Sequence, residues 1–231
     1  MKKPYVICHM TTSLDGKVTG EFLGQDACQS AIQTYYELNR GYQADAFACG
    51  RVTMEESFTG GGDPDLGGYS SESLPREDYT ADPAATYFAV SFDRRGRLDW
   101  KDSRIRDEDP GYDNAYIIEV LCEDVQDACL AYLREKRISY IFGGVDDLDL
   151  SLVLHKLYEQ FGIRTLLLEG GSEINGAFQR EGLLDDLSLV VAPVVGGKEG
   201  KPLFMESAIA QYRLEQVRQY ESGVLWLNYK K

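Results

Sequence analysis

The chain of 231 residues carries 24 Lys and Arg against 38 Asp and Glu, which gives a formal net charge of −14. This charge opposes nonspecific binding to nucleic acid or to an anionic membrane surface. Hydrophobic residues make up 43% and charged residues 27%, a balance that excludes disordered and fibrous classes. The apolar run near the N-terminus, Tyr5 to Met10, is too short for a signal peptide or a membrane span, so we expect a cytoplasmic protein.

The five cysteines are odd in number and scattered through apolar stretches, which is typical of small buried residues. The chain has only two histidines, His9 and His155, and lacks the spaced Cys and His pairs of zinc sites. We therefore expect neither a disulfide framework nor a metal centre. His9 lies in the first predicted strand, where we expect it to be packed or hydrogen-bonded rather than catalytic.

Strand-length apolar runs alternate with helix-periodic segments along much of the chain. Strands are predicted at 4–10, 45–50, 86–92, 114–121, 139–144, 163–171, 187–195 and 223–230. Helices are predicted at 29–40, 124–136, 149–161 and 172–179. The alternation predicts an α/β fold with a mainly parallel sheet and helices on both faces. No good helix separates the strand-like runs after residue 185, which predicts an antiparallel C-terminal edge.

Residues 59–84 form the most polar and glycine-rich stretch of the chain. A linker between domains is one reading, but the pieces that flank the stretch are too short to fold independently. We interpret it as a long surface loop and a candidate substrate lid, because ordered loops of this length usually serve a function.

In an open α/β sheet, ligands bind beyond the carboxyl ends of the strands. One such end is the stretch LLLEGGS (residues 166–172), which we call the leucine corner: three leucines predict a buried strand, and two glycines lead into a helix. The glycines let the backbone approach an anion, and the N–H groups and dipole at the helix start attract phosphate. The leucine corner therefore predicts a pyrophosphate-binding site.

Two further strand ends have related patterns. In AFACGRVTMEES, Gly50 follows a strand, and Arg51 and Thr53 offer a guanidinium and a hydroxyl to phosphate, although a plain strand-to-helix turn also explains the pattern. In SYIFGGVDD (residues 139–147), which we call the FGG corner, two aspartates follow the glycines and would repel an anion unless they cap the next helix. Each pattern alone is more often a turn than a nucleotide site, whereas three strand ends of one sheet support one another.

Three segments carry a resemblance to a known family: TTSLDGKV (11–18), ADAFACGRVTMEE (44–56) and TLLLEGGSEINGAFQREGLLDDLSLVVAPVVGGKEGKPLF (165–204). Together they resemble the C-terminal reductase domain of bacterial riboflavin biosynthesis and its standalone archaeal and fungal counterparts. The resemblance implies a dihydrofolate reductase-like, three-layer α/β/α fold over residues 1–231 as a single domain, without the deaminase domain of the bacterial enzymes. It also implies a homodimer.

The resemblance implies an NADPH-dependent oxidoreductase that reduces the ribosyl group of 5-amino-6-(5-phosphoribosylamino)uracil to a ribityl chain. Asp15 and Glu169 would lie at the substrate cleft, as binding groups or as a source of the proton, although Asp15 also suits a tight turn. Ser91, with Arg94 or Arg95, would bind the 2′-phosphate of the cofactor. The cofactor-binding residues that we predict are Gly50, Arg51, Thr53, Ser57, Ser91, Arg94, Gly143, Gly144, Gly170, Gly171, Ser172, Glu173, Ile174 and Asn175.

The segment SFTGGGDPDLGGYSSESLPRED (57–78) departs from the family, because Arg76 is its only Arg or Lys. Recognition of a substrate 5′-phosphate is therefore left open. One alternative is a dihydrofolate reductase-like enzyme for another pteridine or pyrimidine, although the helix at 29–40 offers only Glu37 as the acid that such enzymes carry there. A second alternative is a protein that binds NADP(H) without catalysis.

Overall fold

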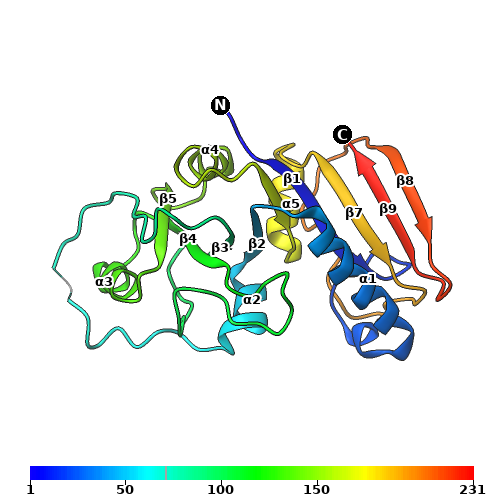
Figure 1. Cartoon of the computed structure of the whole chain (residues 1–231), viewed down its shortest axis with the longest axis horizontal. Coiled ribbons are helices and arrows are strands. Elements are labelled where there is room, and N and C mark those ends of the chain that lie inside the picture. The colour runs from blue at the N-terminus through cyan, green and yellow to red at the C-terminus, as the bar shows by residue number, and fades with distance from the viewer. Residues whose placement is uncertain (71) are drawn as a thin grey trace. The chain divides into compact units, whose positions relative to one another are not determined.

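The computed structural model describes residues 1–70 and 72–231. Each of two compact units is built from separate segments of the chain. We call residues 1–4 with 45–164 the central unit, and residues 5–44 with 165–231 the terminal unit. Figure 1 follows both units by colour along the chain.

In the central unit, four strands pair in parallel in the order β5-β4-β3-β2. They are β2 (Ala46–Gly50), β3 (Phe88–Phe92), β4 (Tyr116–Cys122) and β5 (Ser139–Gly144). Almost every residue of these strands is buried, which is typical of parallel strands covered on both faces and explains why their sequences read as continuous apolar runs.

Three helices belong to this unit. The helices α3 (Asp127–Glu135) and α4 (Leu150–Gln160) pack against β5. The short helix α2 (Arg51–Met54) follows β2 directly and continues as a π-helix over Glu55–Thr59. The helices α2 and α4 begin beyond two of the predicted strand ends, at Gly50 and at the FGG corner, and α3 falls within the predicted helix at 124–136.

The predicted long loop at 59–84 is tied to the central unit. Apart from residue 71, which lies outside the described residues, the chain from 60 to 84 forms no helix and only one isolated bridge, between Tyr79 and Tyr140 of β5. Asp78 accepts from the Lys156 ammonium group at 2.9 Å and so joins the loop to α4. The loop is therefore anchored at its C-terminal end, and its proposed role as a lid stays a prediction.

In the terminal unit, five strands pair in the order β6-β1-β7-β9-β8. They are β1 (Tyr5–Thr12), β6 (Thr165–Leu168), β7 (Asp186–Val191), β8 (Arg213–Gln219) and β9 (Leu225–Lys230). The strand β1 runs parallel to β6 and β7, whereas β7-β9 and β9-β8 are antiparallel. This arrangement confirms the mainly parallel sheet with an antiparallel C-terminal edge. The edge strand β8 was not predicted.

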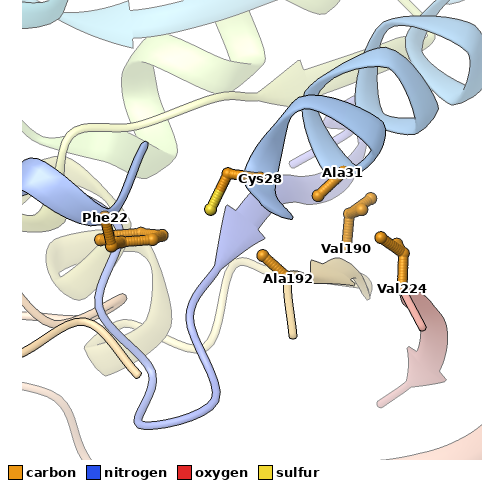
Figure 2. Packing of buried hydrophobic residues seen from close by; sticks show 6 residues of the cluster. All are labelled: Phe22, Cys28, Ala31, Val190, Ala192 and Val224. Carbon is orange, nitrogen blue, oxygen red and sulfur yellow. The ribbon is translucent and has the colours of Figure 1, made fainter. Parts of the chain in front are cut away.

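The long helix α1 (Asp26–Tyr42) packs against β1 and β7 and follows a short 3-10 turn at Glu21–Gly24. Figure 2 shows this part of the core, in which small side chains of α1 meet strand residues. Cys28 and Ala31 are fully buried against Val190, Ala192 and Val224. All five cysteines of the chain are buried, which confirms the prediction that they are small buried residues.

The remaining helix, α5 (Ser172–Arg180), follows β6 and lies next to a segment at 203–208, which we call the strap. Among the described residues, no helix is long and apolar enough to cross a membrane.

Candidate active site

The leucine corner lies in the terminal unit at the end of β6. Leu168 is fully buried and pairs with Cys8 of β1, after which the chain turns through Glu169 and two glycines into α5. Gly170 has a φ of +101°, a conformation that L side chains rarely adopt, and this explains a glycine at that position. Gly171 is the N-cap of α5, and no side chain caps the helix. The first N–H groups of α5 are therefore not satisfied by a side chain, as an anion site requires.

Two buried polar atoms in the first turn of α5 lack a hydrogen-bond partner among the described residues. They are Oγ of Ser172 and Oδ1 of Asn175, in side chains that are 2% and 0% exposed. Buried polar atoms are rarely left without a partner, so these two fit a missing ligand. Glu173 in the same turn is exposed, where water screens its charge, and Ile174 is half-buried. The Ser172 hydroxyl and the open helix end can donate to a dinucleotide phosphate, whereas Asn175 Oδ1 can only accept and would need an N–H or O–H group of a ligand.

The strap fixes α5 from the side. The Met205 N–H donates to the Ser172 carbonyl oxygen at 3.0 Å, and the Gln179 amide exchanges two hydrogen bonds of 2.8 Å with the Ala208 backbone. A Cβ atom added at Gly176 would overlap the carbonyl oxygen of Met205. Glycine is thus required at position 176 because the strap backbone occupies the space of a side chain.

Glu169 is placed where the sequence predicted, immediately after β6, and is 6% exposed. Its Oε1 accepts a hydrogen bond of 2.6 Å from the Nδ2 group of Asn39, which lies on α1 and is 4% exposed. The sequence analysis did not identify Asn39. The only signal available was its place on the buried face of α1, with Cys28, Ala31 and Thr34.

Asp15 lies in an exposed loop of the terminal unit and joins that loop to a second one. Its Oδ1 accepts from the Ser13 hydroxyl and from the Gly196 N–H, both at 2.6 Å. These bonds, that of Ser13 first, hold the pKa of the Asp15 carboxyl below its ordinary value. Asp15 is therefore a carboxylate that orders the loops, and it is poorly suited to give up a proton at neutral pH.

The two joined loops, at 13–20 and 194–203, also gather positive charge. Beyond Asp15, they are held together by the Val18 N–H, which donates to the Lys201 carbonyl oxygen at 2.9 Å. The side chain of Lys17 packs over Gly196, where an added Cβ would lie 2.7 Å from the Lys17 Cγ. Lys198 and Lys201 are exposed on the second loop. With Asp15 and Glu199 on the same loops, the three lysines leave a net charge of +1, a local attraction for an anion that the net charge of −14 does not offer.

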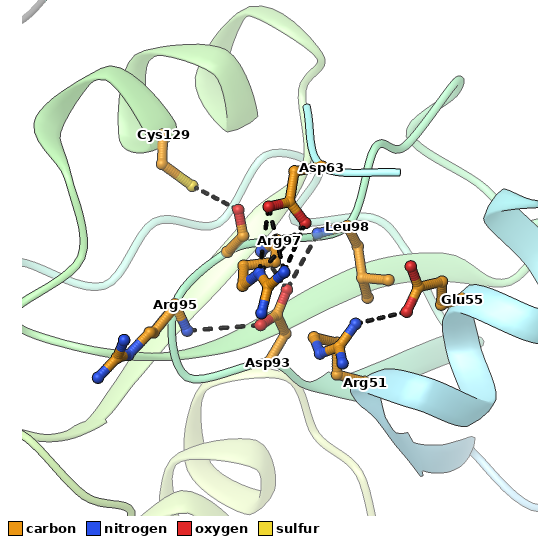
Figure 3. Close-up of polar contacts among 9 residues, drawn as sticks. Arg51, Glu55, Asp63, Asp93, Arg95, Arg97, Leu98 and Cys129 are labelled. Carbon is orange, nitrogen blue, oxygen red and sulfur yellow. Dashed lines mark hydrogen bonds and ion pairs between the residues drawn. The ribbon is translucent and has the colours of Figure 1, made fainter. Parts of the chain in front are cut away.

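In the central unit, the corner at Gly50 holds fewer free groups than the sequence implied. The Arg51 guanidinium forms an ion pair with Glu55 one turn later, as Figure 3 shows. Thr53 is half-buried and Ser57 is exposed. The hydroxyls keep their predicted role toward the cofactor, whereas the charge of Arg51 is partly neutralised within its own helix.

Ser91 lies within β3 and is fully buried. It pairs in register with Glu119 of β4, a carboxyl whose Oε1 accepts from the Trp100 indole N–H. Burial, and then the nearby Asp93, raise the pKa of Glu119 well above its ordinary value. A phosphate bound by Ser91 would therefore need a change in the surroundings of this hydroxyl.

Beyond β3 the chain forms a tight basic turn, drawn in Figure 3. The buried Asp93 carboxylate accepts from the backbone N–H groups of Arg95, Arg97 and Leu98. Arg94 is exposed and forms a surface ion pair of 2.9 Å with Asp147 of the FGG corner. The turn is thus built on Asp93, and the side chains of Arg94 and Arg95 are presented at the surface.

The FGG corner has the predicted strand and turn, but its glycines are used in packing. A Cβ atom at Gly143 would lie 2.7 Å from side-chain atoms of Leu148 and Val153, and one at Gly144 would overlap the Asp147 carbonyl oxygen. The next helix, α4, is capped by Asp149, which accepts from the Leu152 N–H at 2.9 Å. Packing therefore explains both glycines without a ligand.

Two arginines hold the long loop in place: Arg76, which lies within it, and Arg97, which lies on the turn after β3. Arg76 donates to Asp127 at 2.6 Å and to the carbonyl oxygens of Glu123 and Val125 at 2.9 and 2.8 Å. Arg97 forms a two-pronged contact with Asp63, at 3.1 and 3.2 Å. These arginines fasten the loop to the central unit. Within the described ranges, no group of three or more His, Cys, Asp or Glu side chains could hold a metal ion.

Comparison with known proteins places this architecture in a family. Residues 92–226, more than half of the chain, match the model of the RibD C-terminal domain. The 2,5-diamino-6-ribosylamino-4(3H)-pyrimidinone 5′-phosphate reductase of Methanothermobacter thermautotrophicus is 29% identical over 227 residues, which cover 96% of this chain and 94% of the relative.

Two solved structures are similar in fold. A pyrimidine reductase-like protein from Corynebacterium diphtheriae superposes with a TM-score of 0.70 and 17% identity, over 98% of this chain and 91% of that one. The riboflavin biosynthesis reductase of Saccharomyces cerevisiae superposes with a TM-score of 0.63 and 15% identity, over 99% of this chain and 90% of that one. The fold is the dihydrofolate reductase-like one of these reductases. With more than half of its length matched by the family model, this chain belongs to the RibD C-terminal domain family.

Proposed function

We propose that this chain uses NADPH to reduce the ribosyl group of a phosphoribosylamino-pyrimidine to a ribityl chain. It is an oxidoreductase of riboflavin biosynthesis, as its family and its archaeal relative indicate. The resemblance of the sequence implied the uracil form of the substrate, whereas the archaeal relative is named for the 2,5-diamino-pyrimidinone form. Both forms carry the same 5′-phosphoribosyl group, which is the group reduced.

The leucine corner carries the proposal. The α5 helix begins without a side-chain cap, and Ser172 and Asn175 bury polar atoms that have no partner in the described part of the chain. A dinucleotide phosphate would supply acceptors for the N–H groups of this turn. NADPH, when bound, supplies the hydride; the residues of the corner hold and orient it.

Preference for NADPH over NADH is part of the proposal. Arg94 and Arg95, exposed on the turn after β3, are the cations that we assign to the 2′-phosphate, with the buried Ser91 as a weaker candidate. The roles implied by the resemblance for Gly50, Thr53 and Ser57 are retained as proposals, and those for Gly143 and Gly144 are weakened by their packing.

For the substrate, we propose that Glu169 binds N–H groups of the pyrimidine and that Asp15 orders the loop beside it. The lysine-bearing loops at 13–20 and 194–203 are our candidates for the 5′-phosphate, because Arg76 is already held by Asp127 and two carbonyl oxygens. Lysine binds phosphate as a point charge, so these flexible side chains are chemically suited to the task.

One observation favours this substrate over dihydrofolate. The helix α1 presents an amide, Asn39, to the buried carboxylate of Glu169, whereas its predicted acid, Glu37, is exposed to solvent. A carboxylate on this helix, as dihydrofolate reductases use, is therefore replaced here by a group that cannot donate a proton to a pteridine.

We further propose that residues 1–231 form one reductase domain and that the protein is a homodimer in the cytoplasm. Each unit contains two separate segments of chain, which disfavours independent domains. The edge strand β8 is exposed along its whole length and carries Leu214 and Val217, and such edges are commonly covered. Five cysteines outside disulfides suit a reducing compartment.

The test is NADPH oxidation with the diamino-pyrimidinone phosphoriboside, its uracil counterpart and dihydrofolate as separate substrates. We expect turnover with a phosphoriboside and none with dihydrofolate. Glu169→Gln should keep NADPH binding and lose turnover. Oxidation with dihydrofolate alone would replace the proposal by the dihydrofolate alternative, and tight NADPH binding without any turnover would support a non-catalytic role. Light scattering tests the dimer.

A further inference from the structure

We infer that Asn39 is a positioning residue, which holds the Glu169 carboxylate in one orientation toward the substrate. The inference rests on the proposed function and names a residue on α1 that the reaction would depend on without contact to the reacting atoms.

The contact itself is short and buried. Asn39 Nδ2 lies 2.6 Å from Glu169 Oε1, and neither side chain is exposed by more than 6%. A hydrogen bond to an ionised acceptor is stronger than one between neutral groups, and a buried carboxylate without donors is costly. The Asn39 amide is a neutral donor, so its hydrogen bond orients the carboxylate without adding a positive charge. A carboxylate has several lone pairs, so this one bond does not by itself use up the capacity of Glu169 to accept from N–H groups of a pyrimidine.

The position of Asn39 is fixed from the strand side by His9. The Nε2 of His9 lies 3.0 Å from the carbonyl oxygen of Tyr35, one helical turn before Asn39, and the His9 ring stacks on the Tyr35 ring at 4.3 Å. Because a carbonyl oxygen only accepts, Nε2 carries the proton and Nδ1 accepts from the Ser188 hydroxyl at 2.9 Å. Trp226 in turn donates its indole N–H to Ser188 at 2.9 Å.

The pairing of β6 with β1 fixes the position of Glu169 in the same way. Leu168 is the register partner of Cys8, so Glu169, which follows the end of β6, lies at the level of His9, which follows Cys8 within β1. His9 contacts α1 at Tyr35, and Asn39, one turn further along α1, contacts Glu169. This closed circuit of contacts lies within the terminal unit and preorganises the carboxylate before any substrate binds.

The experiment compares three variants in the intact protein. Asn39→Leu keeps the size of the side chain and removes the donor. Asn39→Asp also keeps the size but places a second carboxyl group next to Glu169. Thr34→Val is the matched control: Thr34 is buried on the same helix and donates only within it, to the Ser30 carbonyl oxygen at 2.8 Å. For each variant, kcat and KM with the phosphoriboside, the NADPH dissociation constant and the melting temperature are measured.

For Asn39→Leu we expect kcat to fall about 10- to 100-fold, as for other misplaced catalytic groups, with an unchanged NADPH dissociation constant. Thr34→Val should lower the melting temperature but leave kcat unchanged. In Asn39→Asp the two carboxyl groups can share one proton, and that proton restores a donor to Glu169. Its kcat relative to the original protein should therefore rise as the pH falls, whereas the ratio for Asn39→Leu should stay flat.

An Asn39→Leu protein whose kcat matches that of Thr34→Val would overturn the inference, and so would an Asn39→Asp protein with no recovery at low pH. Failure of the proposed function has a different signature. In that case the unmodified protein turns over neither phosphoriboside, and the role of Asn39 falls with it.

Discussion

The leucine corner and the FGG corner look alike in sequence but differ in what satisfies the helix that follows. Both have a short buried strand and two glycines. In the FGG corner, Asp149 caps α4 and protein atoms fill the space beside both glycines. In the leucine corner, α5 has no side-chain cap and buries polar atoms without partners among the described residues. We therefore propose a ligand site only for the glycine pair whose helix start the protein leaves without a side-chain cap.

The largest expected effect comes from a side chain at the FGG corner. Gly144→Val should lower the free energy of unfolding by roughly 3 kcal/mol, because the new Cβ atom overlaps the Asp147 backbone, which cannot move as a flexible side chain would. Urea unfolding measures the loss, and the folded fraction should keep its NADPH affinity. A stable Gly144→Val protein with weakened NADPH binding would contradict this prediction and indicate that the FGG corner binds the cofactor.

A fall in pH tests the contacts of His9, which support the leucine corner from β1. Burial lowers the pKa of His9 to about 4 from its ordinary 6.5. Neutral His9 therefore contributes fully to the free energy of unfolding above pH 6.5. As the pH falls from 6.5 toward 4, linkage removes about 3 kcal/mol of this free energy. His9→Gln removes this titration. The stability difference between the original protein and His9→Gln, measured by urea unfolding, should shrink over this interval; a constant difference would contradict the assignment.

A valine at the leucine corner, in Gly171→Val, should weaken NADPH binding and not destabilise the fold. Gly171 has a φ of −77°, which any residue adopts, so Gly171→Val strains the backbone little. We expect the NADPH dissociation constant to rise about 10- to 100-fold, or on the order of 1.4–2.7 kcal/mol, because the side chain occupies the phosphate space. Fluorescence titration provides the measurement. Unchanged affinity would exclude the corner as a pyrophosphate site.

The smallest effect should come from removal of Asp149, the side-chain cap that α4 has and α5 lacks. Asp149→Ala leaves the first turn of α4 without its acceptor and should cost about 1 kcal/mol of stability. NADPH affinity should not change, since in our interpretation this helix start binds no ligand. A thermal melt and a parallel titration decide the point.

Most of the strands could be predicted because their residues are buried on both faces and form continuous apolar runs. The strand β8 could not, since every one of its residues is exposed and the sequence RLEQVRQ shows no apolar alternation. The predicted strand at 163–171 contracts to Thr165–Leu168, because the chain turns as soon as Glu169 leaves the sheet. The helix predicted at 29–40 is longer, Asp26–Tyr42. Such ends depend on tertiary contacts that apolar periodicity does not record.

The site residues stay predictions, and only some of the candidates could be proposed from the sequence, for the same physical reason. An acid directly after three buried leucines stands out in the sequence, so Glu169 could be identified. Asn39 could not, because an amide on a helix carries no local sign that its partner lies 130 residues away. The role of Gly143 and Gly144 toward the cofactor stays a prediction, because local sequence cannot tell whether a missing side chain makes room for a ligand or, as the packing here favours, for the protein itself.

The strap has a consequence for anyone who recombines this fold with a related sequence. The strap contributes only backbone atoms to these contacts, whereas α5 contributes the missing side chain of Gly176 and the amide of Gln179. A strap taken from a relative should therefore be accepted as long as α5 keeps Gly176 and Gln179, and a chimera with a larger residue at 176 should have a displaced helix.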